Sequence, residues 1–74
     1  LNDPFMTRQA EHFAGRLTKQ STEVDKQVDL GFRLALGRPA TREEAAELGA
    51  YARKHGLANA CRLLFNANEF VFVD

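Results

Sequence analysis

The chain has 74 residues, in which ten lysines and arginines balance ten aspartates and glutamates, and it contains one cysteine. This length allows a single domain, and a lone cysteine excludes both a disulfide framework and a cysteine-based structural metal site. The balanced charge excludes the broad basic surface that non-specific nucleic-acid binding requires, and no apolar run approaches the roughly 18 residues that span a bilayer.

The first helix is predicted over residues 4–19. Asp3 can cap its first turn, and Pro4 suits the first helical position, where the N–H that proline lacks would have no partner. Apolar residues then recur at the spacing of one helical face, namely Met6, Ala10, Phe13, Ala14 and Leu17.

A second helix is predicted to begin after Ser21 or Thr22, either of which can be its N-cap. Its apolar face consists of Val24, Val28, Gly31, Phe32, Ala35 and Leu36, widened by Leu30 and Leu34. Gly31 lowers helix propensity by about 1 kcal/mol relative to alanine. We therefore expect another helix to approach closely at Gly31.

The stretch LGRPATREE predicts a tight turn between two helices. Gly37 ends the preceding helix, and Pro39 prevents that helix from resuming. Thr41 and Glu44 then form the capping-box pattern Thr-x-x-Glu, in which each side chain satisfies the other residue's backbone N–H. This is the strongest local signal in the chain.

Two further helices are predicted, one over residues 42–55 and one that follows Gly56 from Leu57 and ends in the stretch NANEF. The last six residues, EFVFVD, alternate in a β-type pattern, and so apolar a tail must pack on the helices or on a partner. Phe72 and Val73 in this tail are a candidate contact surface, as is the surface around the first helix. The predicted fold is all-α: a compact four-helix array with a short extended C-terminal tail.

The histidines and the cysteine belong to no recognised catalytic or metal-binding motif. His12 lies on a polar helical face, and His55 lies at a helix end. Cys61 falls on the apolar face of the last helix, where a cysteine behaves as a small hydrophobic residue with a raised pKa. We therefore expect no catalytic residue, metal ligand or cofactor in this domain, and the chain lacks the CxxCH sequence that attaches a c-type haem.

The helix-turn-helix outline around Arg38 and Arg42 is a poor indication of nucleic-acid binding. A recognition helix presents basic and amide side chains along its exposed face. The predicted third helix presents Glu43, Glu44 and Glu47 there, and these carboxylates repel phosphate. We expect no nucleic-acid partner, and weak nucleic-acid binding is the second alternative function.

Arg38 and Glu69 admit two interpretations that their spacing does not separate. In the first, they form a charge-assisted pair in a small core, or Arg38 caps carbonyl groups that the second helix leaves unpaired. In the second, both are exposed side chains whose pairing contributes at most about 1 kcal/mol.

The stretches FRLALGRPATREEAAEL and ACRLLFNANEFVFVD, with LNDPF at the front, closely resemble the C-terminal domain of unknown function of the planctomycete cytochrome-associated protein family. The matching positions are Leu36, Gly37, Arg38, Pro39, Thr41, Glu44, Asn66, Glu69, Phe70 and Phe72. A fainter similarity is to another uncharacterised helical domain of secreted bacterial proteins, with a Leu-Gly-Arg corner and a Glu-Phe ending. Together these resemblances imply that Arg38 and Glu69 belong to the fold. Phe72 departs from the family pattern, in which tyrosine is commoner.

The resemblance implies a C-terminal module of a large exported protein at the cell envelope, with any c-type haem held elsewhere in that protein. The absence of an initiator methionine also suggests a piece of a longer chain. The leading hypothesis is a non-catalytic module that packs on upstream domains of its own chain or on an envelope protein. The first alternative is an accessory part of a glycan-related or redox active site, with His55, Glu69 or Arg38 facing a cleft.

Overall fold

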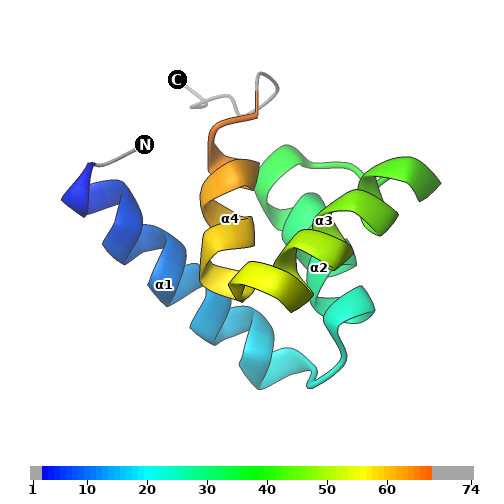
Figure 1. Ribbon diagram of the computed structural model, residues 1–74, viewed down its shortest axis with the longest axis horizontal. Coiled ribbons are helices and arrows are strands. Elements are labelled where there is room, and N and C mark those ends of the chain that lie inside the picture. Colours follow the sequence, from blue (N-terminus) through cyan, green and yellow to red (C-terminus); the bar gives the residue numbers. More distant parts are fainter. Residues whose placement is uncertain (1–2, 68–74) are drawn as a thin grey trace.

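The computed structural model describes residues 3–67, which form four helices (Figure 1). They are α1 (Pro4–Gln20), α2 (Val24–Leu36), α3 (Arg42–His55) and α4 (Leu57–Phe65). Within the described residues there is no strand, so the predicted all-α, four-helix fold is confirmed. The predicted C-terminal tail, with Phe72 and Val73, lies outside them. None of the four helices is long and apolar enough to cross a membrane.

The start of α1 follows the predicted capping chemistry. The backbone N–H of Phe5 donates to Oδ1 of Asp3 at 2.9 Å, and Pro4 occupies the first turn. One face of the helix is buried, through Ala10, Phe13, Ala14 and Leu17. The helix extends to Gln20, one residue beyond the predicted end.

The connection between α1 and α2 corrects one prediction, because neither Ser21 nor Thr22 is the N-cap of α2. Ser21 is instead the extended C-cap of α1, and its Oγ accepts the N–H of Glu23 at 3.0 Å. This local hydrogen bond occupies the serine side chain two residues before α2 begins, and Glu23 takes the N-cap position without a side-chain cap. The buried Gln27 closes the turn by donating from Nε2 to the carbonyl of Ser21 at 2.7 Å.

The helix α4 lies between the other three and packs against each of them (Figure 1). Within the described residues, α1 and α3 make no direct contact, so they lie on different sides of α4. The core joins residues of α1, α2 and α4, namely Ala10, Phe13, Ala14, Leu17, Val28, Phe32, Cys61 and Leu64. The Phe13 and Phe65 rings extend this core with a tilted contact at 5.3 Å between centroids.

The predicted close approach at Gly31 is confirmed. A Cβ placed there would lie 3.4 Å from Cδ1 of Leu17 on α1 and 3.4 Å from Cδ2 of Leu64 on α4. The absent side chain therefore leaves room for two leucines. Leu34, which widens the apolar face predicted for α2, is 51% exposed because no described helix covers that side of α2.

A single residue, Gly56, connects α3 to α4. Its φ of 94° and ψ of 151° lie in a region that is essentially restricted to glycine. Asn59 supports the junction by donating from Nδ2 to the carbonyl of His55 at 2.8 Å. The predicted end of the third helix at Gly56 is confirmed.

Candidate functional site

The corner between α2 and α3 has the conformation that its sequence predicts. Gly37 adopts the left-handed conformation, with φ of 73°, and its N–H donates to the carbonyl of Arg33 at 3.1 Å. The N–H of Thr41 donates to Oε1 of Glu44 at 2.9 Å, and the N–H of Glu44 donates to Oγ1 of Thr41 at 3.1 Å. The capping box is therefore complete.

Arg38 fastens this corner from the outside. Its Nη1 and Nη2 donate to Oε1 and Oε2 of Glu44, each at 2.8 Å, and Nη1 also donates to the carbonyl of Pro39 at 2.9 Å. The guanidinium lies 5.6 Å from the ring centroid of Phe32, so it also covers an edge of the core. Such a two-pronged guanidinium–carboxylate pair fixes orientation as well as distance. Arg38 thus holds the corner together.

The electrostatics of Glu44 follow from these contacts. The hydrogen bonds from Arg38, together with that from the Thr41 N–H, lower the pKa of Glu44 from 4.5 to about 2. About one third of each side chain of the pair remains exposed. A carboxylate that is ionised near neutral pH and has both oxygens engaged is suited to holding a fold and is poorly suited to transferring protons at that pH.

Of the predicted C-terminal residues, only Asn66 lies within the described part of the chain. Its N–H donates to the carbonyls of Arg62 and Leu63, and its Nδ2 donates to the carbonyl of Arg62 at 2.8 Å. Asn66 therefore caps the end of α4, a structural role. The other predicted positions, Glu69 and Phe70, lie outside the described residues, and the proposed pairing of Arg38 with Glu69 remains a prediction.

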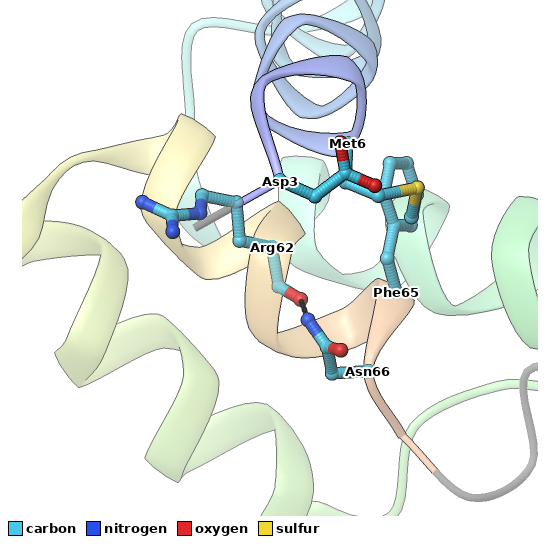
Figure 2. Close-up of a pocket in the computed structure, with 5 residues that line it drawn as sticks. All are labelled: Asp3, Met6, Arg62, Phe65 and Asn66. Carbon is cyan, nitrogen blue, oxygen red and sulfur yellow. Dashed lines mark hydrogen bonds between the residues drawn. The ribbon is translucent and has the colours of Figure 1, made fainter. Parts of the chain in front are cut away.

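Asn66 also lines a small pocket between the start of α1 and the end of α4 (Figure 2). Its other lining residues are Asp3, Met6, Arg62 and Phe65. Figure 2 shows Met6 beside the Phe65 ring, with the Arg62 guanidinium directed away from both. The pocket is small, at about 30 Å³, and has room for a few water molecules.

The residues with reactive side chains are dispersed. The ring of His55 makes a tilted contact with that of Tyr51, at 4.5 Å between centroids, and His12 is exposed on α1. Cys61 is 2% exposed, as predicted, and burial raises the pKa of its thiol to about 11. Among the described residues, no group of three or more histidine, cysteine, aspartate or glutamate side chains could hold a metal ion.

A groove between α1 and α2, here called the basic groove, is a hollow of about 340 Å³. Its lining residues are Arg16, Leu17, Lys19, Gln20, Leu30 and Leu34. The exposed Leu34 lies in an apolar strip that two cations flank. Within the described chain neither Arg16 nor Lys19 has an ion-pair partner, although Arg16 lies 5.9 Å from the ring centroid of Phe13.

A second groove, here called the acidic groove, lies over α3 and α4 and measures about 290 Å³. It is lined by Phe32, Glu44, Glu47, Leu48, Tyr51 and Leu63, and it continues past Tyr51 and Leu63 toward Asn59 and Arg62. Leu63 is 42% exposed. Because Glu44 is engaged by Arg38, Glu47 supplies the charge that is available to another molecule at this end.

Sequence reasoning finds the corner and names the surface around the first helix as a candidate contact surface, but it places no groove there or over α3 and α4. The sequence does contain a signal for the basic groove. Leu30 and Leu34 make the apolar face of α2 wider than the surface that the neighbouring helices cover. Leu63 follows Cys61 by two residues and so lies on nearly the opposite side of α4, and this apolar residue away from the buried face is the signal for the acidic groove.

Comparison of the chain with family models, with curated proteins and with solved structures finds no match. The features of the site therefore rest on the geometry of this chain alone.

Proposed function

We propose that this domain is a non-catalytic helical interaction module that packs against another part of its own polypeptide or against an envelope protein. The observation that carries the proposal is the basic groove, where Leu34 is 51% exposed beside Leu30. A domain of this size has little apolar surface to spare for solvent, so an apolar strip flanked by charges favours a contact surface.

The engagement of Arg38 supports a structural role for the corner residues. Both of its terminal nitrogens donate to Glu44, whose carboxylate also accepts from the backbone of Thr41. These groups stabilise the turn, and the contact surface is therefore sought elsewhere, around α1 and α2.

The family resemblance of the corner and the C-terminal motif supports the wider setting of this proposal. In that setting the domain is the C-terminal module of a large exported, cytochrome-associated polypeptide at the cell envelope. A c-type haem, where that polypeptide carries one, belongs to another domain, because this chain lacks CxxCH.

Site-specific photocrosslinking tests the proposal. A photoreactive phenylalanine analogue replaces Leu34 in the longest natural polypeptide that contains these residues, and the matched control carries it at Glu11, an exposed position of α1 outside both grooves. We expect Leu34 to crosslink to one defined peptide, identified by mass spectrometry, in the same polypeptide or in an envelope protein. Equal labelling from both positions, or none from either, would contradict the proposal.

Two alternatives make different predictions. An accessory role in a glycan-related or redox active site predicts that Arg38→Lys, which cannot keep the two-pronged contact, or His55→Gln lowers turnover by the longer polypeptide without changing its stability. Weak nucleic-acid binding predicts an affinity for duplex DNA that falls steeply with salt. We expect neither result, because Arg38 is committed to Glu44 and the exposed face of α3 carries Glu43 and Glu47.

A further inference from the structure

The basic groove carries positive charge that no neighbouring carboxylate offsets. Arg16 and Lys19 line it from α1, and neither has an ion-pair partner among the described residues. The acidic residue of α1, Glu11, lies five positions before Arg16, which places it about 140° away around the helix. No carboxylate of the described chain lines the groove itself. A partner that covers these two cations therefore has to bring negative charge.

The carboxylates of α2, the other wall of the groove, are already engaged. Each carboxylate of α2 and of its N-cap has a cation within 3.0 Å, in the pairs Glu23–Lys26, Asp25–Arg53 and Asp29–Arg33. Each pair is neutral as a unit, so these groups leave the charge of the α1 wall unbalanced.

An apolar strip runs beside the cations and narrows the class of partner. Leu30 and Leu34 lie one turn apart on α2, and Leu34 is 51% exposed. Nucleic-acid binding depends on many phosphate contacts, and here two cations stand beside leucines that phosphate would leave uncovered. A flat bilayer would bridge the two walls of the hollow without filling it. A polypeptide that carries both apolar and acidic side chains covers the strip and the cations together.

The walls of the groove also favour one secondary structure for that polypeptide. Both walls are α-helices, whose backbone N–H and C=O groups are bonded within each helix. An extended segment in the groove would find no backbone partners along them, and its own covered N–H and C=O groups would stay unsatisfied. An α-helix satisfies its own backbone and presents side chains once per turn, which is the spacing of Leu30 and Leu34.

We infer that the basic groove binds an acidic amphipathic helix, whose apolar side chains pack on Leu30 and Leu34 and whose carboxylates lie against Arg16 and Lys19. The helix comes from outside these 74 residues, because each described helix already buries an apolar face within its own domain. The inference rests on the proposed function, in that it treats the basic groove as the contact surface, and it names the chemistry of the partner.

A synthetic helix tests the inference. The probe is a peptide of about 20 residues, long enough to form a helix in water, with leucine along one face, glutamate along one flank of that face, and alanine and glutamine elsewhere. The matched control peptide has lysine in place of every glutamate. Each is titrated into the isotope-labelled 74-residue chain and followed by NMR.

We expect the glutamate peptide to shift the amide signals of α1 and α2 around the groove. Because the contact is small, the Kd should be about 0.1–1 mM at about 50 mM salt. Binding should weaken at about 1 M salt, where the Debye length falls to about 3 Å. The lysine peptide should bind at least about tenfold more weakly, because it places like charges together.

Variants of the groove separate its two contributions. Leu34→Gln removes the exposed part of the apolar strip, and Arg16→Gln combined with Lys19→Gln removes both charges. Each change should weaken binding of the glutamate peptide at least about fivefold. The matched control is Arg42→Gln combined with Lys54→Gln, which removes two charges at exposed positions of α3 outside the groove and should bind like the parent. Urea unfolding of every variant checks that it is folded.

The inference is overturned by a glutamate peptide that does not bind at about 2 mM, by equal binding of both peptides, or by shifts centred on α3. A short DNA duplex or an anionic lipid vesicle that shifts the groove signals where the peptide does not would also overturn it. The Leu34 photocrosslink separates it from the proposed function. A crosslinked peptide of acidic, helical sequence supports both, whereas a crosslink to a neutral or basic segment of a partner overturns this inference alone.

Discussion

Glu44 accepts three hydrogen bonds that come from two sides of one corner. The guanidinium of Arg38 approaches from the end of α2, and the N–H of Thr41 approaches from the start of α3. A carboxylate has enough lone pairs for all three donors, and each donor stabilises its charged form. The capping role and the ion-pair role of Glu44 therefore depend on the same charge.

We expect the stabilisation that Glu44 provides to be lost in acid. Its pKa is about 2 in the folded chain and 4.5 without these contacts. The folded pKa is the lower one, so the stabilisation is fully present above pH 4.5 and declines as the pH falls toward 2. Urea unfolding of the parent and of Glu44→Gln measures the difference in free energy of unfolding, which should shrink across this window.

The matched control for this prediction is Glu43→Gln, one residue earlier in the same turn of α3. Glu43 makes neither the Arg38 nor the Thr41 hydrogen bond. A difference between parent and Glu44→Gln that stays constant across the window would show that these hydrogen bonds do not form in solution.

The helix connections depend on two glycines that differ in conformation. Gly37 has φ and ψ of 73° and 18°, which asparagine also tolerates, whereas Gly56 has 94° and 151°, which other residues avoid. We expect Gly56→Ala to lower the free energy of unfolding by about 1–3 kcal/mol and Gly37→Asn to lower it by less than about 1 kcal/mol. Thermal and urea unfolding of both variants measure these losses in free energy of unfolding. Equal losses would contradict the claim that the conformation of Gly56 is more restricted to glycine than that of Gly37.

Substitution of two glycines inside helices, Gly15 and Gly31, should change the free energy of unfolding in opposite directions. A Cβ at Gly15 would have no neighbour within 4 Å, so Gly15→Ala should raise the free energy of unfolding by about 0.5–1 kcal/mol through helix propensity. A Cβ at Gly31 would already touch Leu17 and Leu64, so the larger Gly31→Val should lower it by about 1–3 kcal/mol. Stabilisation by Gly31→Val would mean that the three helices are less closely packed there.

The helix boundaries could be predicted wherever one residue's chemistry decides them. Asp3, Gly37 and Thr41 act within their own turn, so their roles follow from the sequence. Ser21 could not be placed in this way, because its hydroxyl accepts the N–H of Glu23, two residues later, and the buried Gln27 anchors the turn through the Ser21 carbonyl. A hydrogen bond between residues six apart, across the turn, therefore determines the conformation of that connection.

The partner of Arg38 shows a similar limit of sequence reasoning. Thr41 and Glu44 satisfy the capping-box pattern by themselves, which leaves no local reason to expect a further donor at Glu44. The grooves are harder still to predict. Periodicity gives the direction of Leu34 on α2, but whether a neighbouring helix covers Leu34 depends on where α1 and α3 lie.

At the scale of the whole molecule, the burial of Cys61 reports on the integrity of the core. The thiol is 2% exposed, and its pKa is raised to about 11 by burial, so little thiolate forms near neutral pH. We expect Ellman's reagent at about pH 8 to modify the native chain only as fast as the core opens, and to modify it at once in denaturant.

A variant with an added exposed cysteine, Lys54→Cys, provides the reference rate for an accessible thiol. Slower modification of Cys61 in the stabilised Gly15→Ala variant would link the reaction to opening of the whole domain. Native Cys61 reacting as fast as the thiol of Lys54→Cys would show that the core around α4 is open.

The position of α4 also determines when this chain can fold. The helix α4 packs against each of the other three, is the shortest, with nine residues, and is the last of the four in the sequence. A chain emerging from the ribosome therefore exposes the buried faces of α1 and α2 before Cys61 and Leu64 can cover them. Folding waits until α4 has left the exit tunnel, so the nascent domain remains unfolded for nearly all of its synthesis.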